Sequence, residues 1–363
     1  MSTHEHSPRI TRRKLLAGTA ALTGAALAFP YIGRGAEPLK VGAYGGYFKD
    51  SFDKHIFPDF SKETGIEVQS VAEPTGEAWL VQLENAARAG QAPADVSMIA
   101  QVPRLKGVNA RLWAPLDPTK LGNRKYLFDN FVHTYDDGSI SGLGAVSWYI
   151  TLVTNTDVYP EAPTSWNALW DPANKDRLGL LALATNSFLL EITAKTYFNG
   201  HDSLQSRDDI RKVLDKLSEV KPNVRLWYRD EGQFQQALQS GEIPMGQYYH
   251  DVTGLAAADG FPVRSTFPRE GGVLDSGSWC VSKASDKLDE AHVFINYMCR
   301  PDVQAKLSRK VGTAPTVKRE HLDLSDKQFA AVASDIPPIL PYYQMYLERG
   351  DWISDQWTAM ITG

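Results

Sequence analysis

The chain has 363 residues, of which 43% are hydrophobic and 22% charged, a composition typical of globular proteins with room for two domains or two lobes. Beyond residue 36 it carries 33 basic and 42 acidic residues, which gives a formal charge of −9. This acidic balance argues against a nucleic-acid partner and is compatible with a cationic ligand.

The first 36 residues differ from the rest of the chain. A twin-arginine sequence, TRRKLL, occupies residues 11–16 and precedes an apolar run of small residues at 15–29. That run is shorter than the roughly 20 apolar residues of a membrane-spanning helix, and residues 26–28 (ALA) offer a cleavage site, with Ala36 as a second choice. We therefore predict a twin-arginine signal peptide at 1–36 and a periplasmic protein, with an uncleaved anchor as the alternative.

Strands and helices alternate in the segment that follows. Apolar runs predict the strands, and Phe48, Phe52, Ile56 and Phe60 share one helical face that Gly65 ends. In order, the pattern predicts a strand at 39–44, a helix at 48–60, a strand at 66–71, a helix at 76–89 and a strand at 95–100. Units of this length favour parallel pairing in an α/β sheet.

A second α/β set begins near residue 143. The pattern predicts strands at 148–155, 178–184, 224–228, 243–250 and 278–282, and helices at 188–198, 210–217, around 234–238 and at 288–298. The proline-containing tail is expected to pack across the surface as loops and helices. Cys280 lies in a strand-like run and Cys299 ends a helix, so two buried free thiols are predicted rather than a disulfide.

Four stretches resemble ABC-transporter periplasmic solute-binding proteins of the spermidine/putrescine-binding type, in extracellular solute-binding family 1. They are FSKETGIEV at 60–68, PTSWNALWDP at 163–172, FPREGGV at 267–273, and the helix at 291–303 followed by GTAP at 312–315. Their order and spacing cover almost the whole chain after the predicted signal peptide.

The resemblance implies an α/β, two-lobed type II periplasmic-binding protein fold. Each lobe would be a mainly parallel sheet flanked by helices, with the ligand cleft between the lobes. Crossovers are expected at 143–148 and 274–279, lobe one at 37–145 plus 278–320, and lobe two at 146–277 plus 321–363. The implied function is capture of a small solute by cleft closure and its delivery to an ABC permease in the inner membrane, by a monomer without cofactor or enzymatic activity.

The polyamine-binding pattern of that family is only partly present. Where its first strand ends, the family has an aromatic, an acid and a tyrosine, and this chain has Tyr44, Gly46 and Tyr47. Tyr248 stands for a family tryptophan, and Asp275 and Gly277 stand for its Trp-x-Asp. The missing acids leave open which cationic, nitrogen-containing solute is bound.

Aromatic and acidic residues at the expected strand ends form the candidate site, because aromatic faces and carboxylates suit an ammonium group. By contrast, Trp166 and Trp170 are expected in the core. The predicted ligand residues are Tyr44, Gly45, Gly46, Tyr47, Trp148, Tyr149, Tyr248, Tyr249, Asp251, Asp275 and Trp279.

Three alternatives remain from the sequence. Adjacent Tyr248 and Tyr249 resemble the phenolate ligands of ferric-binding proteins. The helix start at Gly45 and Gly46 could bind an anionic or zwitterionic solute, assisted by Arg104, Arg225 or Arg264. An enzyme of a different class, similar to thiaminases, would use Cys280 as its nucleophile, although no base or metal motif accompanies it.

Overall fold

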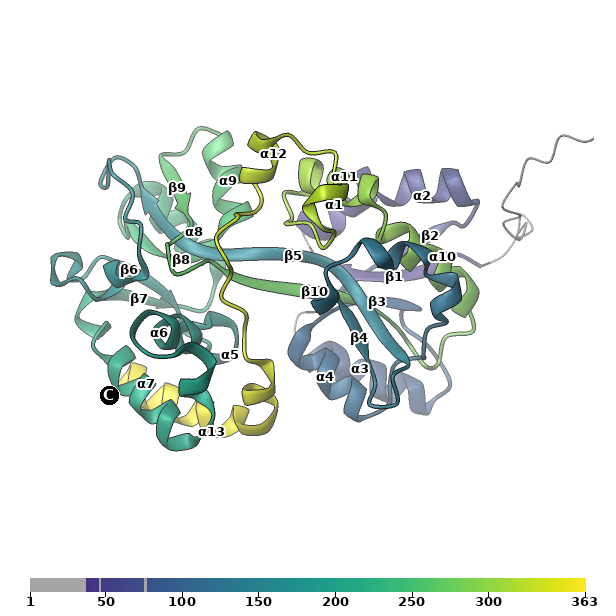
Figure 1. Ribbon diagram of the computed structural model, residues 1–363, viewed down its shortest axis with the longest axis horizontal. Coiled ribbons are helices and arrows are strands. Elements are labelled where there is room, and N and C mark those ends of the chain that lie inside the picture. The colour runs from purple at the N-terminus through teal and green to yellow at the C-terminus, as the bar shows by residue number, and fades with distance from the viewer. Residues whose placement is uncertain (1–36, 46, 75–76) are drawn as a thin grey trace, which may run out of the picture.

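The computed structural model describes residues 37–45, 47–74 and 77–363. The predicted signal peptide at 1–36 therefore lies outside the described residues, as does Gly46. Two lobes are joined by the long strands β5 (Ile140–Asn155) and β10 (Val273–Val281), which run between them (Figure 1). Lobe one holds β1–β4, α1–α4, α10 and α11, and lobe two holds β6–β9, α5–α9 and α13.

The strands form one path, β2-β1-β3-β10-β5-β8-β6-β7, with β4 and β9 paired to β5. In lobe one, β1 pairs in parallel with β2 and β3, and in lobe two β6 pairs in parallel with β7 and β8. β5 and β10 are antiparallel to each other. The remaining bounds are β1 Leu39–Tyr44, β2 Val68–Glu73, β3 Val96–Ala100, β4 Val132–Thr134, β6 Leu178–Leu181, β7 Val224–Tyr228, β8 Met245–Tyr249 and β9 Val263–Thr266.

Helices cover the sheets of both lobes (Figure 1). In chain order they are α1 Tyr47–His55, α2 Phe57–Thr64, α3 Glu77–Arg88, α4 Gln101–Asn109, α5 Ala184–Ser187, α6 Leu189–Tyr197, α7 Arg207–Ser218, α8 Glu231–Ser240, α9 His250–Ala258, α10 Leu288–Met298, α11 Pro301–Val311, α12 Asp326–Ala330 and α13 Tyr343–Thr362. None of the helices in the described part of the chain has the length and apolar character needed to cross a membrane.

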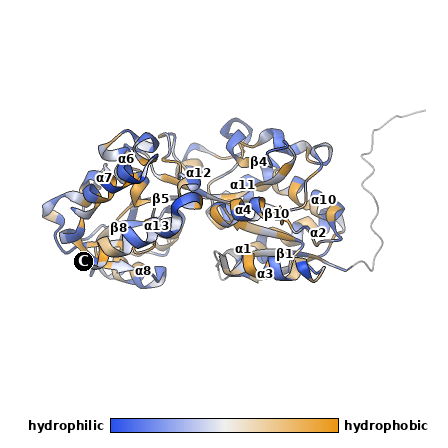
Figure 2. Cartoon of the chain, turned by 90° about the horizontal axis from the view of Figure 1, so that it is seen from below, coloured by the Kyte–Doolittle hydropathy of each residue, from blue (hydrophilic) through white to orange (hydrophobic). Residues whose placement is uncertain are grey.

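Each lobe has its own hydrophobic core (Figure 2). In lobe one, Trp279 on β10 packs edge-on against Phe294 of α10, with ring centroids 5.0 Å apart. In lobe two, Trp166 is fully buried and donates from Nε1 to the Gly271 carbonyl at 2.8 Å. Separate cores allow the lobes to move as units about the strands that join them.

Most predicted elements are confirmed, and the exceptions have local causes. The strand at 224–228 and the helix at 288–298 have the predicted bounds. The single helix expected at 48–60 is wrong, because α1 ends at His55 and α2 begins at Phe57, with Pro58 in its first turn. Proline lacks a backbone N–H and fits a first turn, whereas inside a helix it would clash with the preceding turn.

The joining strands are longer than predicted. β10 begins at Val273 rather than at 278, because residues 273–277 pair with β5 over the span between the lobes. The expected crossovers at 143–148 and 274–279 lie within these two strands. Cys280 and Cys299 are both buried and unbonded, as predicted.

Candidate functional site

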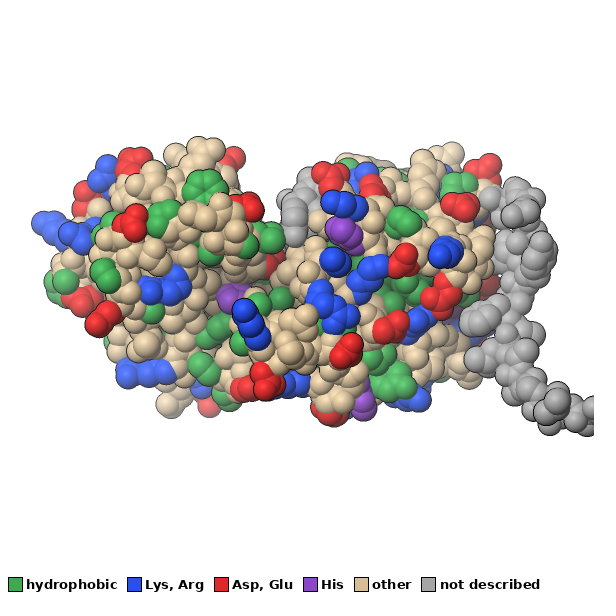
Figure 3. Space-filling view, turned by 90° about the horizontal axis from the view of Figure 1, so that it is seen from above, with side chains coloured by type: hydrophobic (Ala, Val, Ile, Leu, Met, Phe, Trp, Pro, Cys, Tyr) green, Lys and Arg blue, Asp and Glu red, His purple; other side chains and the backbone are tan. Residues whose placement is uncertain are grey.

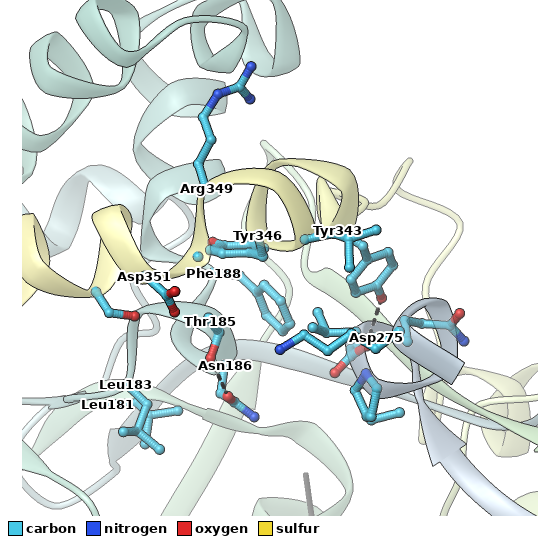
Figure 4. A pocket seen from close by; sticks show the side chains of 18 of the residues that line it. Leu181, Leu183, Thr185, Asn186, Phe188, Asp275, Tyr343, Tyr346, Arg349 and Asp351 are labelled. Atoms are coloured by element: carbon cyan, nitrogen blue, oxygen red, sulfur yellow. Dashed lines mark hydrogen bonds between the residues drawn. The ribbon is translucent and has the colours of Figure 1, made fainter. Parts of the chain in front are cut away.

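A cavity of about 1040 Å³ lies between the lobes, where the surface is notched in Figure 3. Its walls come from the end of β1, the start of α4, the joining strands, the loop from β6 to α5, the first turns of α8 and α9, and one side of α13. Figure 4 shows the part of this cavity that α13 borders. Carboxyl ends of strands and helix starts thus converge on one space, the usual place for a ligand in α/β folds.

Asp275 lies on β10 directly opposite Trp148 of β5. Its Oδ1 accepts hydrogen bonds from the Tyr343 hydroxyl at 2.7 Å and from the Ser276 amide at 2.7 Å (Figure 4). Burial raises the pKa of Asp275 to about 6, and the Tyr343 hydrogen bond only partly offsets it. Both bonds fall on Oδ1, which leaves Oδ2 for a ligand.

Two further acids come from the first turns of lobe-two helices. Asp251 of α9 is 8% exposed, and its Oδ1 has no hydrogen-bond partner among the described residues. Burial raises its pKa to about 6, and the nearby Glu231 of α8 adds to this effect. Glu231 is an exposed residue, but partial desolvation of its carboxyl raises its pKa, although the Tyr249 hydroxyl donates to its Oε1 at 2.9 Å.

Aromatic side chains lie beside these acids. Tyr44 and Trp148 meet edge-on with ring centroids 6.4 Å apart, and both line the cavity together with Tyr249. The pKa of Tyr44 is well above its ordinary value because of burial first and then the charges of Glu73 and Asp275. These rings can therefore offer neutral faces to a cation held by the carboxylates.

The acids are not neutralised within the protein. Among the described residues, no lysine or arginine is placed to lower the pKa of Asp251, Asp275 or Glu231. Four cations also line the cavity, namely Lys106, Arg207, Arg229 and Arg349. The Arg207 guanidinium lies over the Trp352 ring, and the Arg349 side chain points away from the labelled cluster in Figure 4. A buried acceptor without a donor is unfavourable, so the site favours a ligand that brings positive charge and N–H groups.

Six of the predicted ligand residues line the cavity, namely Tyr44, Gly45, Trp148, Tyr249, Asp251 and Asp275. Gly46 lies outside the described residues, and the side chain of Tyr47 is likewise not described. Asp275 of the joining strand and Asp251 of α9 thus line the same cavity.

The other three predicted ligand residues pack away from the cavity. Trp279 is fully buried in the core of lobe one. Tyr149 packs edge-on against Phe267 with ring centroids 5.0 Å apart, and the Tyr248 hydroxyl donates to the Glu231 carbonyl at 3.1 Å. We therefore correct the assignment of Trp279, Tyr149 and Tyr248 from ligand contact to packing.

Several cavity residues were not predicted. Glu231 begins α8, and Tyr343 and Tyr346 begin α13, a helix in the proline-containing tail. Tyr343 and Tyr346 are three residues apart and follow Pro341, a spacing that places both rings on one face of a helix starting there. That spacing was the available signal, but it does not say which surface the helix covers.

The sequence alternatives find little support in the geometry. Burial raises the pKa of Tyr248 and Tyr249, the wrong direction for phenolate ligands, and no group of three or more histidine, cysteine or acidic residues in the described ranges could hold a metal. The pKa of Cys280 is raised to about 12, which does not suit a nucleophile.

The arginines proposed for an anionic ligand are engaged elsewhere. Arg104 is buried and donates from Nε to Gln101 Oε1 at 2.7 Å. Arg225 forms surface ion pairs, and Arg264 donates to the Tyr159 carbonyl at 2.8 Å.

Comparison with known proteins gives consistent results. A family model described as bacterial extracellular solute-binding protein matches residues 55–331. Spermidine/putrescine-binding periplasmic protein 1 of Haemophilus influenzae is 27% identical, over 83% of this chain and 80% of its own length. The putrescine-binding periplasmic protein PotF of Escherichia coli is 26% identical, over 72% of this chain and 75% of its own.

The fold is also similar to solved structures. A putative extracellular solute-binding protein from Bordetella parapertussis superposes with a TM-score of 0.76 at 19% identity, covering 89% of this chain and 98% of that one. At this level of identity the likeness supports the two-lobed fold and says nothing of the ligand.

Proposed function

Because the chain belongs to the bacterial extracellular solute-binding proteins, we propose that it captures a small cationic solute with N–H groups in its cleft, for delivery to the permease of an ABC importer. The observation that carries this proposal is Asp251, a buried carboxylate that lines the cavity with one oxygen lacking any hydrogen-bond partner among the described residues. Asp275 and Glu231 each use one oxygen within the protein and have the other to offer.

An N–H-bearing cation satisfies these acceptors, whereas a quaternary ammonium would leave them without donors. The polyamines named for the curated relatives are cations of this kind. An anionic solute would be repelled by these carboxylates, whose ionisation is already disfavoured by burial and by neighbouring acids.

We further propose a division into lobe one at 37–145 plus 278–320 and lobe two at 146–277 plus 321–363, and closure about β5 and β10. Two large hydrophobic clusters lie on either side of these strands, and most members of each cluster fall within one of the two proposed lobes. This packing supports the division. We also propose that the protein acts in the periplasm as a monomer after export by the twin-arginine route, without enzymatic activity.

Thermal denaturation of the mature protein, with and without candidate solutes, tests the proposal. Putrescine, spermidine, agmatine and the monoamine phenethylamine are compared with glutamate, γ-aminobutyrate and choline. A solute present at 100 times its Kd stabilises the folded state by about 2.7 kcal/mol. We expect stabilisation by at least one N–H-bearing cation and none by choline.

A matched pair of variants links that result to the site. Asp251→Asn removes the buried charge that lines the cavity, and Asp202→Asn removes an exposed acid of lobe two. The first should lose the ligand-induced rise in Tm and the second should retain it. Stabilisation by glutamate alone, or an unchanged response of Asp251→Asn, would contradict the proposed function.

A further inference from the structure

The cavity has an apolar wall on the side of lobe two. Leu181 at the end of β6, Leu183 before α5 and Phe188 between α5 and α6 line it, with the polar Thr185 and Asn186 of α5 beside them (Figure 4). Leu181 and Phe188 are only 4% and 3% exposed. Leu183 is 40% exposed, one of the few large apolar side chains of the described residues that are so open. An exposed leucine inside a ligand cavity is a surface that an apolar part of a ligand can cover.

Phe188 is held in a backbone conformation that bulky residues rarely adopt. Its φ is 51° and its ψ is 22°, and it links the end of α5 to the start of α6. The left-handed region favours glycine or asparagine, since a side chain there crowds the following carbonyl. Strain of this kind persists where the surrounding structure or a function requires the side chain.

The strained backbone places the Phe188 ring next to the acidic part of the cavity. The ring packs edge-on against Tyr343 and Tyr346, with centroids 6.4 Å away in each case. Tyr346 is anchored by its hydroxyl to Glu191 Oε2 at 2.8 Å, and Tyr343 donates to Asp275. Phe188, Tyr343 and Asp275 therefore follow one another along the cavity wall, as Figure 4 shows.

The charges near this apolar wall are of a different kind from those at Asp275. Glu348, Asp351 and Asp355 line the cavity from α13, but all three side chains are exposed. Glu348 also lies 3.2 Å from Arg349. Exposed acids are screened by water and salt, whereas the buried carboxylates of Asp251 and Asp275 are screened far less.

We propose that Phe188 is a specificity-determining residue, and that the solute is a cation with one N–H-bearing head and an apolar body, an alkyl or aryl amine or guanidine, rather than a diamine. The head binds at Asp275 and Asp251, and the body covers Leu183 and the edge of the largely buried Phe188 ring that borders the cavity. A second ammonium group would lie against this apolar wall and lose its hydration without gaining a buried carboxylate. The inference rests on the proposed function and narrows its ligand.

Calorimetric titration of the mature protein with matched pairs tests the inference. Hexylamine is compared with 1,6-diaminohexane, and phenethylamine with putrescine. The wild-type protein should bind each monoamine at least tenfold more tightly than its diamine partner. Phe188→Asn keeps a residue that tolerates positive φ and removes the ring, so monoamine affinity should fall at least tenfold and diamine affinity much less.

Two controls keep this result interpretable. Phe128→Asn removes an exposed phenylalanine of lobe one, 41% exposed and outside the cavity, and should change neither affinity. Leu183→Ser alters an exposed side chain of the same apolar wall and should also weaken monoamine binding. It serves as the test if Phe188→Asn does not fold.

The outcomes separate the two proposals. Tighter binding of the diamines, with a monoamine-to-diamine ratio unchanged in both Phe188→Asn and Leu183→Ser, would overturn this inference and leave cation capture standing. Binding of neither amine class, together with binding of an anion, would overturn the proposed function itself.

Discussion

Cation capture by this cleft should weaken steeply as the pH falls. Burial raises the pKa of Asp251 and of Asp275 to about 6 each. At pH 7.5 both carboxylates are almost fully ionised, whereas at pH 5 only about one tenth of each is. If binding needs both charges, the affinity for a cation falls about 100-fold, or about 2.7 kcal/mol, between these pH values.

Neighbouring groups influence the ionisation of the two acids. Glu231 faces Asp251, while Tyr343, the Ser276 amide and Glu191 act on Asp275. Titration calorimetry at constant ionic strength from pH 7.5 to 5 measures the profile, with the solute chosen by thermal denaturation. Asp275→Asn should weaken binding and halve the remaining pH dependence on a logarithmic scale, to about tenfold. An affinity that stays constant down to pH 5 would show that neither Asp251 nor Asp275 binds the cation as a carboxylate.

Three other predictions address stability and positioning. Burial raises the pKa of Asp251 from 3.8 to about 6, so ionisation of this carboxyl favours the unfolded chain. Asp251→Asn should therefore stabilise the ligand-free protein by up to about 3 kcal/mol at pH 7.5. In thermal denaturation this gain in stability should shrink as the pH falls through 6 toward 3.8. Tyr343→Phe removes a hydrogen bond to Asp275, and titration should show cation affinity about 3- to 10-fold lower and a binding midpoint at higher pH. Trp279→Ala should cost about 3–5 kcal/mol of unfolding free energy in urea, whereas Trp148→Ala should mainly reduce affinity.

The fold was accessible from the sequence wherever local signals were strong. Apolar periodicity and flanking residues gave α10 and β7 with their observed bounds. The prediction of one helix at 48–60 was wrong because the apolar spacing continues through Pro58, where the backbone hydrogen bonding does not. The length of β10 could not be predicted, since its first residues pair with β5, a strand more than 100 residues earlier.

The site was less accessible, for reasons of side-chain direction. Strand alternation places Asp275 and Trp279, four residues apart, on one face. The register of β10 shifts between Gly277 and Ser278, so the alternation does not carry across that point. Asp275 therefore faces the cavity and Trp279 fills the core of lobe one. The contact from Tyr343 to Asp275 joins residues 68 positions apart, and no local pattern connects them.

The acids of the cleft are distributed unevenly between the two lobes. The buried Asp251 and the exposed Glu231 belong to lobe two and Asp275 to a joining strand, while lobe one brings Tyr44 and Lys106 to the same space. Buried carboxylates attract a cation more strongly than an aromatic face does, which contributes about 0.5–2 kcal/mol. Most of the affinity should therefore lie on lobe two and the joining strands, so a solute can bind there before the cleft closes. Closure then adds the aromatic face of lobe one and excludes water, and excluding water strengthens the attraction between the solute and the carboxylates already in contact with it.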